Sequence, residues 1–207
     1  MLNEPLVILA NGSFPTHPIP LQSLQEAQTI ICCDGAAESL VSFGKTPDYI
    51  IGDLDSISEN LKEQFREIII SKPDQNENDL RKAITFAEEN GCTSLNILGA
   101  SGKREDHLLA NVFTVLEFAP HIKLTMQSDS GMFRRISGFE EISSFSGQQI
   151  SLFCKNSDIS MTTTNLKYNL INSNLTNLYC GSLNESVSDI FTIELSHGSL
   201  LLFQSYS

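Results

Sequence analysis

Hydrophobic positions up to about residue 127 come in short continuous runs and do not alternate with polar positions. Such runs are typical of strands that are buried on both faces of a parallel sheet. Six of them predict strands, at residues 5–10, 29–33, 48–52, 67–71, 94–99 and 121–127. Because the segments between them suit helices, we expect an α/β fold with helices on both faces of a parallel sheet.

Four segments between these runs carry helix signals. They predict helices at residues 34–43, 56–65, 77–90 and 105–118. In the second of them, Ser56-x-x-Glu59 has the spacing of a capping box, which predicts that the helix begins at Ser56. The third and the fourth have apolar faces, and Gly91 follows the third as a typical C-terminal stop.

The pattern changes after Gly131. Residues 136–207 contain only two basic residues, Lys155 and Lys167, and are rich in Ser, Thr and Asn. No convincing helix interrupts the predicted strands, which lie at residues 148–154, 158–163, 166–171, 189–195 and 199–203. This succession predicts a small antiparallel β-sandwich or barrel, with a domain boundary near residues 128–136.

Composition narrows the possible partners of this 207-residue chain. The net charge of −12 argues against binding to nucleic acid or to an anionic membrane, and no apolar run is long enough to span a bilayer. The five cysteines show no C-x-x-C spacing, so we expect neither a disulfide framework nor a zinc site. The N-terminal segment lacks the basic region of a signal peptide, and together these features predict a cytoplasmic protein.

Polar clusters with at least one aspartate follow four consecutive predicted strands. The clusters are Asp34-Gly35, Asp53-Leu54-Asp55, Lys72 to Asp79, and Gly102 to His107. A single aspartate after a strand is most often a helix cap. Ligands of open parallel sheets bind beyond the carboxyl ends of the strands, so four such clusters on one edge predict a functional site.

Asp53 and Asp55 are the most suggestive pair. They lie on one side of the chain if it stays extended, and a cation would relieve their repulsion. Mg²⁺ prefers carboxylate, water and phosphate oxygens. Lys103 and Arg104 supply local positive charge, and arginine binds phosphate through two parallel hydrogen bonds. We therefore expect a magnesium–phosphate site.

The order of these motifs resembles that of the thiamine pyrophosphokinase family. The similar segments are CDGAA (33–37), PDYIIGDLDSI (47–57), DQNENDLRKAI (74–84), GKREDHLLAN (102–111), LKYNL (166–170) and GSLNES (181–186). The resemblance implies transfer of a pyrophosphoryl group from ATP to the hydroxyl of thiamine, with Mg²⁺ as cofactor and AMP as product. It also implies an α/β ATP-binding domain (1–130), a β-sandwich domain (131–207) for thiamine binding and dimerisation, and a homodimer with thiamine between subunits.

The resemblance also implies roles for individual residues. The expected metal ligands are Asp53, Asp55, Asp79 and Asp106. Arg104 would neutralise phosphate charge, and either Asp34 or Asp106 would act on the thiamine hydroxyl. The expected substrate-binding residues are Gln75, Asn78, Lys103, His107, Asn111, Tyr168, Ser182 and Asn184.

Three positions depart from the family pattern, and three alternatives stay open. Asn78 replaces a threonine, Lys103 a glycine and Leu183 a serine. Tyr168 could present its ring to the thiamine cation or pack inside the sandwich. The protein could also be another Mg²⁺-dependent phosphotransferase or nucleotide hydrolase, or a thiamine or nucleotide sensor without turnover.

Overall fold

The computed structural model describes residues 2–74 and 76–207. The chain divides into two compact units, Met1–Asp129 and Ser130–Ser207. The first unit alternates strands with helices, and in its described residues the second unit has strands without helices. No helix in the described ranges combines the length and the apolar character needed to cross a membrane.

A six-stranded sheet forms the centre of the first unit. Its strands are β1 (Leu6–Leu9), β2 (Thr29–Cys33), β3 (Tyr49–Gly52), β4 (Ile69–Ser71), β5 (Ser94–Leu98) and β6 (Lys123–Gln127). They lie in the order β6-β5-β1-β2-β3-β4, and every neighbouring pair is parallel. All six predicted strands are therefore present, within two residues of their predicted ends.

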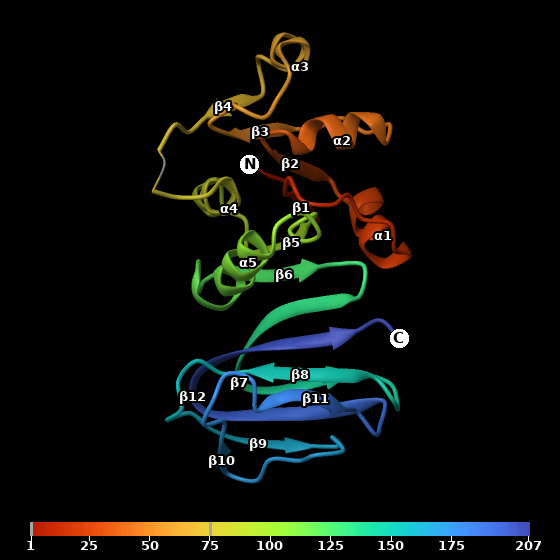
Figure 1. Ribbon diagram of the computed structural model, residues 1–207, viewed down its shortest axis with the longest axis vertical. Helices are drawn as coiled ribbons and strands as arrows, with labels where there is room; N and C mark the ends of the chain where they lie inside the picture. The colour runs from red at the N-terminus through yellow and green to blue at the C-terminus, as the bar shows by residue number, and fades with distance from the viewer. Residues whose placement is uncertain (1, 75) are drawn as a thin grey trace. The chain divides into compact units, whose positions relative to one another are not determined.

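Five helices lie around this sheet in the part of the first unit that the structure describes. They are α1 (Pro18–Glu26), α2 (Ala36–Ser42), α3 (Glu59–Gln64), α4 (Asp79–Glu89) and α5 (Glu105–Glu117). Figure 1 shows α1 and α2 on one side of the strands, and α4 and α5 on the other. The side chains agree, because Leu24 of α1 and Leu40 of α2 pack with Val7 and Ile30 of the sheet. The expected α/β fold with two helical layers is confirmed.

Two helix starts differ from the sequence prediction. α1 was not predicted, although Pro18 fits the first helical turn, where a missing N–H costs no hydrogen bond. α3 begins at Glu59 with Ser58 as its N-cap, so the predicted cap at Ser56 is wrong. The Ser56 hydroxyl instead donates to Asp55 (2.8 Å), and its backbone N–H donates to Asp34 (2.9 Å).

The second unit is built around one long strand. Its strands are β7 (Gly131–Ser143), β8 (Gln149–Phe153), β9 (Ser160–Thr164), β10 (Ser173–Asn174), β11 (Gly181–Glu185) and β12 (Ile190–Ser205). β12 pairs antiparallel with β7 along most of its length. Its first half also pairs with β9, and its second half with β8. β10 extends the first group and β11 the second, so two antiparallel sheets share β7 and β12.

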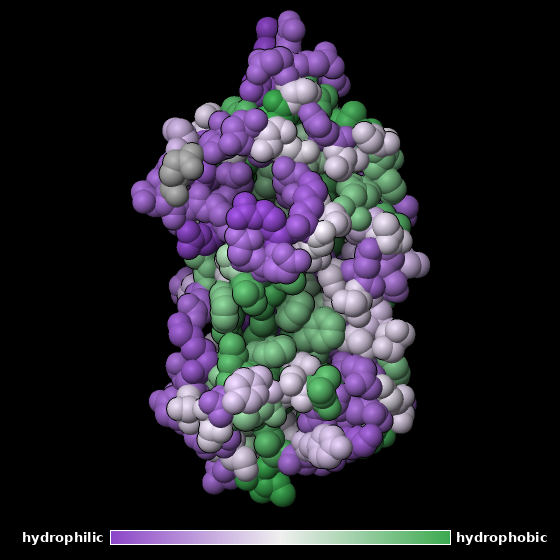
Figure 2. Space-filling view, in the orientation of Figure 1, coloured by the Kyte–Doolittle hydropathy of each residue, from purple (hydrophilic) through white to green (hydrophobic). Residues whose placement is uncertain are grey.

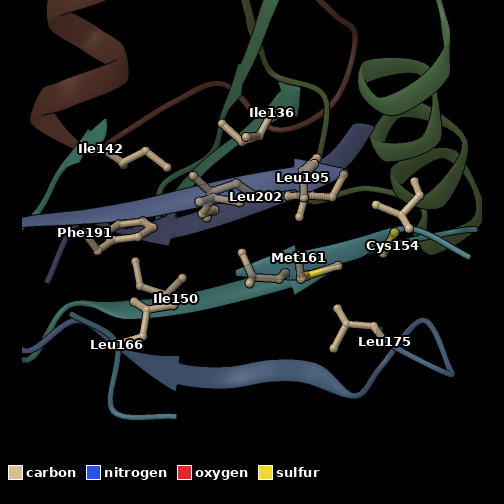
Figure 3. Packing of buried hydrophobic residues seen from close by; sticks show 14 residues of the cluster. Ile136, Ile142, Ile150, Cys154, Met161, Leu166, Leu175, Phe191, Leu195 and Leu202 are labelled. Atoms are coloured by element: carbon tan, nitrogen blue, oxygen red, sulfur yellow. The ribbon is translucent and has the colours of Figure 1, made fainter. Parts of the chain in front are cut away.

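The core of the second unit lies between these two groups of strands. Figure 3 shows Phe191 and Leu202 of β12 in the same apolar cluster as Ile150 of β8 and Met161 of β9. All four side chains are almost completely buried. This β domain matches the predicted fold class, and burial of these side chains supplies most of its cohesion.

Several strand predictions for the second unit are wrong in detail. Residues 189–195 and 199–203 belong to one strand, which changes register between Glu194 and Ser199. Residues 166–171 form a turn and an isolated bridge, because the Asn169 side chain accepts from the Leu166 N–H (3.1 Å). β7 and β11 were not predicted, since charged and polar positions interrupt their apolar pattern.

Candidate active site

The carboxyl ends of several parallel strands open into one pocket of about 590 Å³ in the first unit. The pocket collects residues that follow β1, β2, β3 and β5, together with the starts of α4 and α5. Among the predicted site residues, its lining includes Asp34, Asp53, Asp55, Asn78, Asp79, Lys103, Arg104, His107 and Asn111. Gln75, the predicted nucleotide contact, lies outside the described residues.

Glycines let the loops after β1 and β5 meet at the edge of the pocket. The Gly12 N–H donates to the Gly99 carbonyl (2.6 Å), and a Cβ on Gly12 would lie 2.2 Å from that oxygen. Gly102 has φ +91°, and a Cβ there would lie 2.3 Å from the Ser13 hydroxyl oxygen. These strands neighbour each other where the strand order reverses, which is the usual ligand-binding position in such sheets.

Asp34, Asp53 and Asp55 form a cluster of three carboxylates. One oxygen from each residue lies within 4.8 Å of the other two. The chain between Asp53 and Asp55 is not extended, because Leu54 adopts φ +69° and packs against the core. The carboxylates converge because the backbone turns at Leu54, so the extended geometry considered from the sequence is wrong.

Asp34 is the buried member of this cluster. Its Oδ2 accepts from the Ser56 N–H, whereas Oδ1 has no partner among the described residues. Burial is the main cause that raises the pKa of Asp34 to about 6, with smaller contributions from the Asp55 side chain and the charge of Asp79, against the lowering effect of the Ser56 hydrogen bond. A buried oxygen without a donor is costly, and a cation would remove this cost.

The cluster is chemically suited to Mg²⁺. Octahedral Mg²⁺ holds its oxygens at about 2.1 Å, so neighbouring ligands lie roughly 3–4 Å apart. The three oxygens lie within 4.8 Å of one another, which is compatible with this spacing, and Asp55 is exposed. The donor set and the partnerless Asp34 Oδ1 together fit a divalent cation.

Asp79 lies beside this cluster but is held by another partner. It is the first residue of α4, and its Oδ1 accepts from the Lys82 ammonium at 3.0 Å. A Cβ on Gly52 would lie 2.9 Å from Asp34 Cβ and 3.3 Å from Asp79 Oδ2, so the two acids approach each other across Gly52. Lys82 also lines the pocket and was not predicted. Its position on the otherwise apolar face of α4 was the available signal.

Asn78 and Asn111 connect the two helix starts. Asn78 caps α4 by accepting from the Arg81 N–H (2.9 Å), and its amide donates to Asn111 (3.4 Å). Asn111 is buried and donates to the Ala100 carbonyl (3.0 Å). These bonds fix α4, α5 and the loop after β5 around the pocket.

The basic residues of the last cluster lie at the exposed rim. The Arg104 guanidinium forms two hydrogen bonds with Asp106, which hold the pKa of that carboxyl below its usual range. Asp106 is therefore not part of the carboxylate cluster, and its predicted metal role stays a prediction. The Lys103 ammonium donates to Asn11 (3.0 Å), a pocket residue after β1 that was also not predicted.

The remaining predicted residues lie in the second unit. Tyr168 is 64% exposed, so it is not a core residue of the β domain. The buried Asn184 side chain accepts from the Tyr168 N–H (3.1 Å) and donates to its carbonyl (2.8 Å). Ser182 donates to the Tyr179 carbonyl (2.8 Å), and Leu183 is exposed with φ +61°. Asn184 thus fixes the backbone of Tyr168, while the ring projects outward.

Comparison with known proteins gives consistent matches for both units. Residues 21–126 match the family model "Thiamin pyrophosphokinase, catalytic domain", and residues 131–203 match "Thiamin pyrophosphokinase, substrate-binding domain". Thiamine pyrophosphokinase 1 of Oryza sativa subsp. japonica is 28% identical over 209 residues, covering 86% of this chain and 78% of that protein. Thiamine pyrophosphokinase 3 of the same plant is 32% identical over 128 residues, covering 50% of this chain and 48% of that protein.

Solved structures share the fold along almost the whole chain. Thiamine pyrophosphokinase from Bacillus subtilis superposes with a TM-score of 0.82 at 23% identity, covering 98% of this chain and 99% of that one. The Candida albicans structure gives 0.80 at 19% identity, with coverages of 97% and 89%. The two family-model matches do not favour the phosphotransferase, hydrolase and sensor alternatives. The chain therefore belongs to the thiamine pyrophosphokinase family, whose members are diphosphotransferases.

Proposed function

We propose that this protein transfers the pyrophosphoryl group of Mg-ATP to the hydroxyl of thiamine and releases thiamine diphosphate and AMP. The observation that carries the proposal is the cluster of Asp34, Asp53 and Asp55 in a pocket that also contains Lys103 and Arg104. Carboxylates suit a divalent cation, and the basic residues suit phosphate oxygens. Family membership identifies the reaction class.

Each part of the pocket has a role in this proposal. Mg²⁺ held by Asp53 and Asp55, beside Asp34, would neutralise charge on the phosphates. Arg104 would exchange its bond with the exposed Asp106 for phosphate oxygens, and Lys103 would add a second positive charge. Asn78 would complete the nucleotide site from the start of α4. Such transfers depend mainly on positioning and charge stabilisation.

The thiamine hydroxyl needs a group that can accept its proton. Of the two candidates, Asp106 is the weaker base as long as Arg104 is bonded to it, since this bond lowers its pKa. The pKa of Asp34 is raised to about 6, close to the value that serves a proton acceptor near neutral pH. Bound Mg²⁺ would lower the pKa of any carboxylate that holds it. We therefore propose that Asp34 accepts the proton, while Asp53 and Asp55 hold the metal.

Thiamine binding and assembly involve the second unit in this proposal. The exposed ring of Tyr168 is available for a cation–π contact with thiamine. On the face drawn in Figure 2, the surface over the second unit carries apolar side chains among hydrophilic ones. The exposed apolar residues of the second unit include Ile171, Tyr179 and Leu183, and such a surface suits a homodimer interface. Light scattering should give about twice the 22.9 kDa chain mass, and a fully active monomer would contradict the dimer.

We also propose a cytoplasmic location. The five cysteines are free, and four of them are buried. Free thiols suit a reducing compartment.

The decisive experiment measures nucleotide products from Mg-ATP with and without thiamine. Release of AMP that requires thiamine supports the proposed reaction. Release of ADP, or of AMP without thiamine, would assign the pocket to another phosphotransferase or to a hydrolase. Saturable binding without any product would indicate a sensor.

A further inference from the structure

Lys82 is the only lysine or arginine that is buried in the described part of the chain. Its side chain is 6% exposed, and its ammonium lies 3.0 Å from Asp79 Oδ1. It lines the pocket together with Cys33 at the end of β2. A buried ammonium is costly unless it is paired, so the position of Lys82 needs a specific reason.

Helix stability does not explain this pair. Lys62 and Glu59 on α3 have the same spacing of three residues and a contact of 2.7 Å. That pair lies on the surface, with side chains 29% and 88% exposed, and surface pairs contribute little. The Lys82–Asp79 pair differs because it lies inside a pocket that four further carboxylates also line: Asp34, Asp53, Asp55 and Glu77.

The surrounding charge supplies the reason. Asp34, Asp53 and Asp55 converge, and Asp79 approaches Asp34 across Gly52. Four acids in a partly buried site repel one another strongly when nothing neutralises them. The Lys82 ammonium places a positive charge of the protein beside these acids, and α4 holds it there.

We propose that Lys82 is an internal counter-ion that exchanges partners. It neutralises Asp79 in the protein without nucleotide, and it donates to a phosphate oxygen when nucleotide is bound. This inference rests on the proposed function, because it assumes that a phosphate enters the pocket. Lys82 is then a positioning residue for Asp79 and a binding residue for the nucleotide.

The exchange gives two effects of opposite sign. Lys82 opposes the binding of a bare divalent cation, since it repels the cation and occupies one carboxylate. It favours the binding of a triphosphate, since its charge is opposite. If Lys82 only stabilised the fold, its removal would not strengthen the binding of the bare cation and at the same time weaken the binding of the triphosphate.

The test uses the full chain and the variant Lys82→Met, which keeps the length of the side chain without its charge. Calorimetry with MgCl₂ alone should show binding about tenfold tighter than in wild type, or about 1.4 kcal/mol. At saturating Mg²⁺, α,β-methylene-ATP should bind about tenfold more weakly. Lys62→Met is the matched control and should change neither affinity.

Other outcomes are also decisive. Unchanged affinities for Lys82→Met, or a parallel loss of both, would overturn the inference. A variant that is unfolded without metal should fold when Mg²⁺ is added, and failure to do so would also overturn it. If wild type binds the nucleotide but no Mg²⁺, the metal part of the proposed function fails. The nucleotide measurement then still tests Lys82.

Discussion

The pocket of the first unit and the Tyr168 surface of the second unit use polar side chains in different ways. In the pocket, carboxylates converge and Asp34 Oδ1 is left without a donor. In the second unit, both functional atoms of the Asn184 amide are used by the backbone of Tyr168. Carboxylates that repel one another and leave a buried oxygen without a donor indicate a site for chemistry. A buried polar side chain with all its hydrogen bonds formed, such as Asn184, indicates a residue that holds a neighbouring backbone in place.

The largest expected effect comes from removing a charge from the carboxylate cluster of the pocket. Asp53→Asn or Asp55→Asn keeps the size of the side chain and removes a charge from the cluster. Thiamine-dependent AMP release should fall by roughly 10² or more, because about 3 kcal/mol of charge stabilisation is lost. The melting temperature without metal should hold or rise, since repulsion between the acids decreases.

Asp189→Asn is the matched control for these variants. Asp189 is an exposed carboxylate of the second unit, outside the pocket. This substitution should leave both rate and melting temperature near wild type. Near-normal turnover in both the Asp53 and the Asp55 variants would contradict the proposal that these residues hold Mg²⁺.

The next effect concerns the rim of the pocket. In the structure Arg104 forms two bonds with Asp106, and both side chains are largely exposed. Arg104→Lys keeps the charge but loses the planar geometry that binds two phosphate oxygens. If Arg104 acts on phosphate, turnover should fall more than about tenfold while the melting temperature stays close to wild type. An unchanged rate with a lowered melting temperature would assign Arg104 to the ion pair alone.

The same contrast explains what could be predicted from the sequence. Strand ends are visible as apolar runs, and parallel pairing brings them to one edge, so Asp34 and Asp53 could be placed before the structure was known. Lys82 was marked only by its charge on the apolar face of α4, and its partner depends on where α4 packs. In the second unit, the single strand across residues 190–205 depends on pairing with three partners. Such long-range pairing leaves little local signal.

A smaller effect distinguishes the role of Asn184, which holds the backbone of Tyr168, from the role of the exposed Tyr168 ring. Asn184→Ala leaves the buried backbone groups of Tyr168 without partners, so the free energy of unfolding should fall by about 1–3 kcal/mol. The KM for thiamine should also rise several-fold. Tyr168→Ala should raise this KM by a similar factor with little loss of stability, because the ring is exposed.

Chemical denaturation and steady-state kinetics on the two variants check this distinction. Tyr168→Phe is the control, since it retains an aromatic face. Equal losses of stability in the Asn184 and Tyr168 alanine variants would contradict the separate roles.

The smallest expected effects are on stability and depend on pH. The folded protein holds the proton of Asp34 more tightly than the unfolded chain, because burial raises its pKa from 3.8 to about 6. The stability of the metal-free protein should therefore fall as pH rises from about 4 to 6. In Asp34→Asn this contribution should be absent, which thermal melts in EDTA across this range would show.

Glu4 provides a contribution of the opposite sign, far from the pocket carboxylates. Its Oε1 accepts from the Thr93 and Ser94 N–H groups (2.7 and 3.1 Å), and these bonds lower its pKa below 4.5. The stability that Glu4 contributes should be present above this value and should disappear as pH falls through the lowered pKa.

Glu4→Gln should thus lower the melting temperature slightly at pH 7 and by less at pH 3, because the protonated Glu4 resembles the amide. A larger loss at pH 3 than at pH 7 would contradict this sign. Because Asp34 and Glu4 are both carboxylates, opposite slopes in one chain would show that burial sets the sign at Asp34 and hydrogen bonding at Glu4.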